Sequence, residues 1–221
     1  MSDLLLYSYF RSSTSYRTRI ALNYKNLTYK YIPVHLTNNG GEQYLEEYKK
    51  LNPLSEVPTL IHNGKALSQS VAIIEYLDEV FPDPHLYPKD PYTKARVRQF
   101  CEIINSFLHP LSNLKVLKKL ELDNGYDQKK KEQWIQHWSQ IGFSSLENLL
   151  DSGTHYCFGN EITAADVFLA PAIFSANRFQ VNLVGYKRLL DIEQRLNQHQ
   201  AFMDAHPLRQ PDTPEFEKTL V

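Results

Sequence analysis

The stretch Arg11-Ser12-Ser13-Thr14-Ser15 lies between an apolar run and a segment with helical periodicity. The run Leu4-Leu5-Leu6-Tyr7 fits a buried strand, whereas the apolar residues Ile20, Ala21 and Tyr24 recur at helical spacing. A row of hydroxyl residues directly before a helix is typical of a helix N-cap. We therefore predict a strand, a hydroxyl-rich loop and a helix, with hydroxyls and unbonded backbone N–H groups facing one small volume.

This loop has the chemistry of an anion site. Free N–H groups and the helix dipole favour negative charge, and a hydroxyl can donate to a sulfur anion and lower the pKa of the thiol. Four of the five residues carry a hydroxyl and none is a cysteine, so any thiol chemistry here needs an external thiol. The alternative interpretation is a capped helix whose serines are simply solvated.

Strand and helix signals alternate from this loop to Phe81. Val57-Pro58 leads into one predicted strand, and Asn63-Gly64 favours a hairpin turn after it. The predicted order is β-α-β-α-β-β-α. The segments after the first helix are a strand at 29–34, a helix at 42–50, strands at 57–61 and 66–68, and a helix after Gln69-Ser70.

A change of composition marks a second part of the chain. Pro82, Pro84, Pro88 and Pro91 lie close together, as in a linker, and almost everything beyond them has helical spacing. We predict an α/β domain over 1–82, a proline-rich linker over 83–91 and an all-helical domain over 92–221. Pro110 is expected to interrupt one of these helices. Thr163 and Asp166 form a capping-box pattern before another.

Composition excludes several classes of function. A net charge of −1 gives no global attraction for nucleic acid or an anionic membrane. Cys101 and Cys157 are too few for a disulfide framework, and the N-terminus has no secretory signal pattern, which favours a reducing compartment. The histidines lack the paired spacing of a metal site. We expect a soluble, cytoplasmic, metal-free protein that binds neither nucleic acid nor membrane.

The segment Ser12–Leu22 resembles the Ser-Ser-Cys-x-Trp-Arg-x-Arg-Ile-Ala-Leu motif of zeta-class glutathione transferases. Thr14 stands where that family usually has Cys, and Tyr16 where it often has Trp. The resemblance covers nearly the whole chain and implies the glutathione transferase architecture, with a thioredoxin-like α/β domain followed by an all-α domain. It also implies a cis Val57-Pro58 bond, with the backbone of Val57 pairing with the glutathione peptide.

The resemblance further implies that glutathione is the cofactor and that Ser12, Ser13 and Thr14 are catalytic. Gln69 and Ser70 would receive the γ-glutamyl carboxylate, although Ser70 alone also fits an ordinary N-cap. Gln43 is expected to be an exposed helical residue that contacts glutathione, and His109 stands where the family has Gln. The full predicted glutathione-binding set is Ser12, Ser13, Thr14, Ser15, Tyr16, Arg17, Gln43, Val57, Gln69, Ser70, His109 and Asn113.

Arginines are the expected partners of the substrate. The activity that the resemblance implies is the glutathione-dependent isomerisation of maleylacetoacetate to fumarylacetoacetate, in tyrosine and phenylalanine catabolism. This substrate carries two carboxylates, which guanidinium groups bind in bidentate fashion. We predict that Arg11 and Arg178 bind substrate and that Arg19 is structural. A homodimer is also expected from the family.

Two alternatives stay open. The same thiolate site and arginines suit a transferase or dehalogenase acting on haloacids or other small electrophiles, because Thr14 departs from the motif itself. The chain could also be a non-catalytic interaction module of the same fold. The retention of Ser12, Ser13, Gln69, Ser70 and Val57-Pro58 argues against the module, which has no use for a complete glutathione site.

Overall fold

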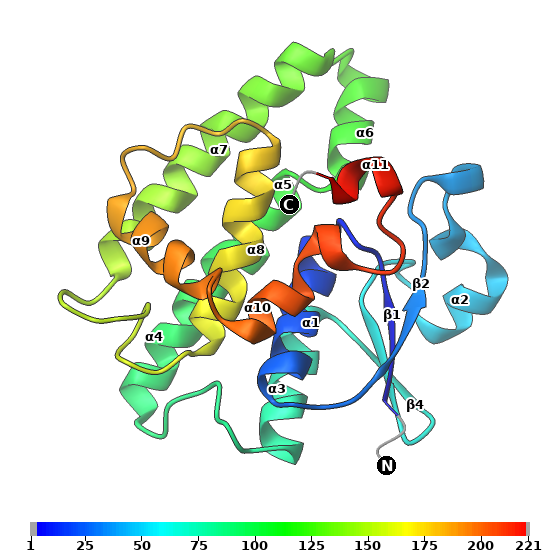
Figure 1. Cartoon of the computed structure of the whole chain (residues 1–221). Coiled ribbons are helices and arrows are strands. Elements are labelled where there is room, and N and C mark those ends of the chain that lie inside the picture. The colour runs from blue at the N-terminus through cyan, green and yellow to red at the C-terminus, as the bar shows by residue number, and fades with distance from the viewer. Residues whose placement is uncertain (1–3, 220–221) are drawn as a thin grey trace. The chain divides into compact units, whose positions relative to one another are not determined.

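The computed structural model describes residues 4–219, which form two compact units (Figure 1). The first unit contains the residues up to His85 together with those from Gln198 onward, and the second is Leu86–Asn197. This grouping differs from the predicted helical domain 92–221, because the final segment packs with the first unit. The outer ends of the predicted domains, at 1 and 221, lie outside the described residues.

The first unit is built on a four-stranded mixed sheet with the order β2-β1-β3-β4. The central strand β1 pairs in parallel with β2 and antiparallel with β3, and β3 forms a hairpin with β4. Leu6 and Leu60 face each other across β1 and β3, and both are fully buried. The strands are β1 Leu4–Ser8, β2 Lys30–Pro33, β3 Thr59–His62 and β4 Lys65–Ser68. The predicted α/β arrangement is confirmed.

Helix α1, Ser13–Tyr24, is buried over most of its length, including the polar side chains of Arg17, Thr18 and Arg19. It packs on α3, Ser70–Val80, and on α10, Gln200–Ala205. In Figure 1 α2 lies beyond β2, on the side of the sheet away from α1 and α3. Because its neighbours cover it on several sides, α1 lacks the polar outer face of a surface helix.

Two segments differ from their predicted boundaries by more than one residue at an end. The helix expected at 42–50 consists of a short 3₁₀ turn, Glu42–Tyr44, and helix α2, Glu46–Leu51, separated by an extended Leu45. The strand expected at 57–61 begins only at Thr59, because Pro58 has no N–H to donate to a sheet ladder. The Val57-Pro58 bond is cis, as predicted.

The C-terminal part of the first unit has three short helical segments. Helix α10 precedes a 3₁₀ turn, Pro207–Arg209, and a final short helix, α11, Glu215–Lys218. Arg19 on α1 donates to the carbonyl of Ala205 at 3.0 Å. This segment is therefore hydrogen-bonded to the helix that begins at the hydroxyl-rich loop.

The regular secondary structure of the second unit is helical, apart from an isolated bridge between Tyr156 and Gly159. The α4 ladder passes into π geometry at Ile103–Leu108, just before Pro110, whose missing N–H prevents a regular α ladder. Gly142 permits close packing there, since a Cβ at this position would lie 2.3 Å from a Leu108 methyl carbon. Its helices are α4 Pro91–Glu102, α5 His109–Leu111, α6 Leu114–Asn124, α7 Gln128–Leu149, α8 Ala164–Arg178 and α9 Lys187–Leu196.

The predicted capping box at the start of α8 is confirmed. The carboxylate of Asp166 accepts the N–H and the hydroxyl of Thr163 at 2.8 and 2.9 Å, and also the N–H of Cys157 at 3.0 Å. Within residues 4–219, no helix has the length and apolar character needed to cross a bilayer. In the same range, no cluster of three or more His, Cys, Asp or Glu side chains is arranged to hold a metal ion.

Candidate glutathione site

Ser12 is the N-cap of α1. Its backbone is extended, and its Oγ accepts the N–H of Ser15 at 3.2 Å. This cap satisfies one first-turn N–H group and fixes where the helix begins. The loop and the dipole of α1 are therefore arranged as the sequence predicts, with the hydroxyls of Ser12, Ser13 and Thr14 at the positive end of the helix.

Thr14 joins this loop to the segment before β3. Its hydroxyl donates to the carbonyl of Val57 at 2.9 Å, and its Oγ1 lies 2.9 Å from Oγ of Ser12. A hydroxyl has one proton, and that of Thr14 is used on the Val57 carbonyl, which can only accept. Ser12 is therefore the donor in its contact with Thr14. Its own proton is held by Thr14 in this arrangement.

The backbone before Val57 is held by a buried polar network. The carbonyl of Glu56 accepts the hydroxyl of Tyr48 at 2.5 Å and the side-chain amide of Asn52 at 2.7 Å. Tyr48 also lies 2.9 Å from the hydroxyl of Thr59, at the start of β3. Burial raises the pKa of Tyr48 to about 12, so its hydroxyl stays protonated and able to donate.

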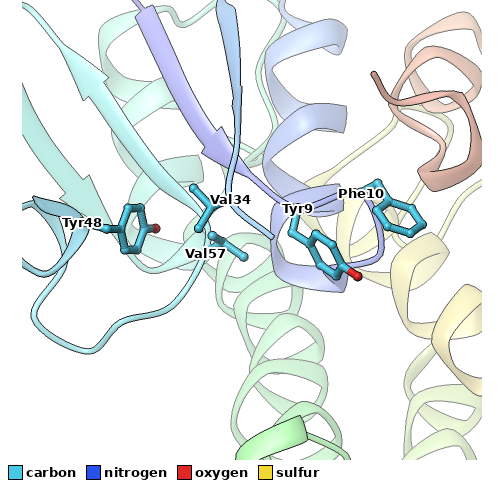
Figure 2. Packing of buried hydrophobic residues seen from close by; sticks show 5 residues of the cluster. All are labelled: Tyr9, Phe10, Val34, Tyr48 and Val57. Atoms are coloured by element: carbon cyan, nitrogen blue, oxygen red, sulfur yellow. The ribbon is translucent and has the colours of Figure 1, made fainter. Parts of the chain in front are cut away.

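An apolar cluster supports both loops. Figure 2 shows its five buried members, Tyr9, Phe10, Val34, Tyr48 and Val57. Tyr9 and Phe10 come from the exit of β1, and their rings meet edge to face with centroids 4.8 Å apart. The cluster thus packs the residues that precede the hydroxyl-rich loop together with Val57, which Thr14 binds.

The start of α3 adds a second polar group of side chains. Its N-cap is Gln69, with a φ of 73° that L-residues other than Asn and Asp seldom adopt. Ser70 is therefore the first helical residue and not the cap. Its Oγ accepts Nη1 of the buried Arg17 at 3.2 Å, so two predicted site residues on different helices are brought together.

The prediction that Gln43 is exposed is wrong. Only 4% of the residue is exposed, and its side-chain amide donates to the carbonyl of Leu36 at 3.1 Å. Gly41 makes this burial possible, because a Cβ there would lie 2.6 Å from the Gln43 side chain, and its φ of 108° is unfavourable for other residues. Tyr16 is also buried, and the guanidinium of Arg19 lies over its ring, 5.4 Å from the ring centroid.

Arg19 is structural, as predicted. It is fully buried and donates to the carbonyls of Tyr9, Phe10 and Ala205 and to the hydroxyl of Ser8, over 3.0–3.3 Å. A planar guanidinium can satisfy several acceptors at once. It therefore connects the end of β1, α1 and α10.

The C-terminal segment contributes two carboxylates that the sequence analysis did not identify. Asp212 accepts the N–H of Phe10 at 3.0 Å and the hydroxyl of Tyr31 at 2.7 Å. Glu217 forms an ion pair with Arg11, the predicted substrate residue. No short-range pattern connects residues some 200 positions apart.

The remaining predicted residues belong to the second unit. His109 opens α5, and Asn113 is the N-cap of α6, with its side-chain oxygen accepting the N–H of Lys115 at 2.9 Å. The side chains of His109 and Asn113 approach to 3.5 Å. Arg178 is the last residue of α8, and its guanidinium lies 5.0 Å from the ring centroid of Phe179.

Comparison with known proteins places the chain in a family. Residues 2–79 match the family described as glutathione S-transferase, N-terminal domain. A maleylacetoacetate isomerase from Rattus norvegicus is 44% identical over 211 residues, which cover 95% of each chain.

Two solved structures are also similar. A maleylpyruvate isomerase, described as a bacterial zeta-class glutathione S-transferase, is 38% identical with a TM-score of 0.92, over 95% of this chain and 100% of its own. A maleylacetoacetate isomerase from Methylobacterium extorquens AM1, with bound malonate and glutathione, is 29% identical with a TM-score of 0.90, over 95% and 99% of the two chains. The chain therefore belongs to the glutathione S-transferase family, in the zeta-class branch of the maleylacetoacetate isomerases.

Proposed function

We propose that this protein is a glutathione-dependent cis–trans isomerase that converts maleylacetoacetate to fumarylacetoacetate. The observation that carries the proposal is the hydroxyl-rich N-terminus of α1, joined by Thr14 to Val57. The relatives with the same architecture that are named for this activity support it. Its place would be in tyrosine and phenylalanine catabolism.

The residues present fit glutathione. The buried Oγ of Ser15 and the buried Oε1 of Gln43 have no hydrogen-bond partner among the described residues, and buried polar atoms of this kind are rare in a complete structure. Both residues are in the predicted glutathione-binding set. The start of α3 at Gln69 and Ser70 provides free N–H groups suited to a carboxylate. When bound, glutathione supplies the thiolate nucleophile that the chain itself lacks in this loop.

The chain's own residues would activate the thiol of glutathione and orient the cofactor and the substrate. Ser13, or Ser12 once its hydroxyl proton is released from Thr14, would donate to the sulfur, and the α1 dipole would favour the anionic form of the thiol. The backbone of Val57, fixed by Thr14 and by the Glu56 carbonyl network, would hold the peptide part of the cofactor. Arg11 would bind a substrate carboxylate and help to stabilise the negative charge that develops during addition.

Further assignments rest on the family resemblance. We propose that His109 and Asn113 contact glutathione and that Arg178 binds substrate. We also propose that the protein is a cytoplasmic homodimer. The two cysteines, Cys101 and Cys157, are buried and form no disulfide, which fits a reducing compartment. Light scattering on the purified protein tests the dimer.

A second candidate function is conjugation or dehalogenation of haloacids. It is favoured by Thr14, which replaces the family's cysteine inside the motif, while the rest of the loop is retained. Both functions use the same thiolate site and the same arginines. In the isomerisation the thiolate adds to the substrate and is eliminated again, so the product has the same composition. In the second function the thiolate displaces a halide.

A coupled assay separates these functions. Purified protein is given maleylacetoacetate and fumarylacetoacetate hydrolase, with and without glutathione, and in parallel a chloroacid with glutathione. Turnover of maleylacetoacetate only in the presence of glutathione is the expected result. Halide release without isomerisation would contradict the isomerase and support the second function. Failure to bind immobilised glutathione would support the non-catalytic module.

A further inference from the structure

The guanidinium of Arg11 contacts a carboxylate along one edge and an aromatic ring on one face. Its Nε lies 3.2 Å from Oε2 of Glu217, and its Nη2 donates to Oε1 of the same carboxylate. Its carbon centre lies over the ring of Phe10, 5.2 Å from the centroid. Glu217 therefore binds the side edge of the fork, while Phe10 supports the plane.

Glu217 does not bind the other edge of the guanidinium, which is formed by Nη1 and Nη2. A guanidinium presents five N–H donors, and the Nη1–Nη2 edge can bind a second carboxylate with two parallel hydrogen bonds. The Arg11 side chain is 39% exposed, whereas that of Glu217 is 10% exposed. The Arg11 side chain therefore keeps exposed surface while its carboxylate partner is enclosed, and Glu217 occupies the Nε–Nη2 edge and not the Nη1–Nη2 edge.

The C-terminal segment fixes both parts of this support. Glu217 lies on α11, and Asp212 accepts the N–H of Phe10, the residue whose ring lies beneath Arg11. Two carboxylates from one segment therefore set the position and the plane of a guanidinium more than 200 residues away. A long, flexible arginine otherwise loses much side-chain entropy when it binds a ligand.

We propose that Glu217 is a positioning residue for the carboxylate-binding function of Arg11. It holds the guanidinium by its side edge and presents the end edge to a carboxylate of a dicarboxylate substrate. The inference rests on the proposed function, since it assigns Arg11 to substrate. It adds a requirement for the C-terminal helix α11 in substrate recognition.

The sign of the effect on affinity distinguishes positioning from simple electrostatics. Glu217 is an anion near a site for a dianion, so on Coulombic grounds alone its removal would tighten dicarboxylate binding. Positioning predicts the opposite. We expect Glu217→Ala to weaken the affinity for malonate and raise KM for maleylacetoacetate, each about tenfold, with the KM for glutathione unchanged. Glu217→Gln, which keeps one acceptor oxygen, should lie between Glu217→Ala and the wild type.

The experiment measures malonate binding by calorimetry, and kinetics with maleylacetoacetate, in Glu217→Ala, Arg11→Ala and the double variant. If Glu217 acts through Arg11, the double variant is no weaker than Arg11→Ala alone. Glu215→Gln on the same helix is the matched control, because Glu215 is exposed and, within residues 4–219, forms its ion pair with Lys218 at 2.6 Å and not with Arg11. It should behave as the wild type.

The inference would be overturned if Glu217→Ala bound malonate more tightly than the wild type or equally well. It would also be overturned if Glu217→Ala weakened malonate binding as much in the Arg11→Ala background as in the wild type. A wild type that binds no dicarboxylate would overturn it as well. A wild type that binds malonate with the predicted dependence on Glu217, yet does not isomerise maleylacetoacetate, would contradict the proposed function and leave this inference standing. Unchanged glutathione affinity and an unchanged melting temperature show that each variant is folded.

Discussion

The hydroxyl of Thr14 donates to the carbonyl of Val57 at 2.9 Å, which connects the N-terminus of α1 to the residue before a cis proline. Because Thr14 has a single proton, the neighbouring Ser12, 2.9 Å away, must donate to it. The residue that replaces the family's cysteine therefore both restrains Val57 and competes for the Ser12 proton. A thiol in its place would form weaker hydrogen bonds to both groups.

Replacing Thr14 with Val should separate these two roles. Loss of the bond to Val57 should raise KM for glutathione about fivefold, since such a bond contributes about 1 kcal/mol. Release of the Ser12 proton should at the same time lower the pKa of the bound thiol, measured from thiolate absorbance against pH. Thr14→Ser keeps both hydrogen bonds and should match the wild type. A thiol pKa that is unchanged in Thr14→Val would contradict the proton assignment.

Gln69 is expected to lower the free energy of unfolding while its side chain contributes to glutathione binding. Its φ of 73° is unfavourable for an L-residue, so Gln69→Gly should raise the free energy of unfolding by about 1 kcal/mol. The same variant should raise KM for glutathione through loss of the side-chain amide. Gln69→Ala keeps the Cβ and is the control, so it should lose cofactor affinity without gaining stability. Urea unfolding and glutathione kinetics measure the two effects, and equal stability of the Gly and Ala variants would be evidence against strain.

Arg19 should be among the most sensitive positions for folding. Arg19→Met would leave its four buried acceptors without their donor, and we expect a loss of about 3 kcal/mol or more in urea unfolding. Arg19→Lys keeps the charge but not the planar fork, and should recover only part of this loss. The exposed Arg209, in the same C-terminal segment, provides the control Arg209→Met. A loss below 1 kcal/mol in Arg19→Met would show that these contacts are replaceable.

Two histidine caps should make the first unit sensitive to acid. Nδ1 of His199 and of His206 accepts the N–H of Ala201 and of Leu208, at 3.2 and 3.3 Å. Burial lowers the pKa of both, and Arg209 and Arg19 lower that of His206 further. The unfolded state therefore binds protons more readily. The contribution of the two histidines to the free energy of unfolding is complete above their pKa in the unfolded state, about 6.5. It is lost as the pH falls below this value, towards the lowered pKa values of the folded state.

The double variant His199→Asn/His206→Asn tests this pH dependence. An asparagine oxygen can accept the same cap N–H groups but does not titrate in this range. We expect the free energy of unfolding to fall less between pH 7 and pH 5 than in the wild type. His137→Asn, at an exposed position on α7, is the control and should leave the slope unaltered. A double variant with the wild-type slope would assign the acid sensitivity to other groups.

Local patterns determined much of the fold and part of the site. Apolar runs and apolar residues at helical spacing, the hydroxyl run before α1, the Asn63-Gly64 turn and the Thr163 capping box all act between residues close in sequence, so their outcome could be predicted. The same holds for Ser12 as a cap and for the Val57-Pro58 junction, where the family resemblance supplied the cis bond. Arg19 was expected to be structural, but the sequence did not indicate which groups it binds.

Tertiary structure alone decided the supports of the site. The burial of Gln43 depends on the positive φ of Gly41, and the Arg17–Ser70 contact depends on how α1 packs on α3. The largest difference is the C-terminal segment, which belongs to the first unit and brings Asp212 and Glu217 to Phe10 and Arg11. Such contacts depend on where folding places distant parts of the chain, and a carboxylate has the same appearance in the sequence whether it is solvated or paired.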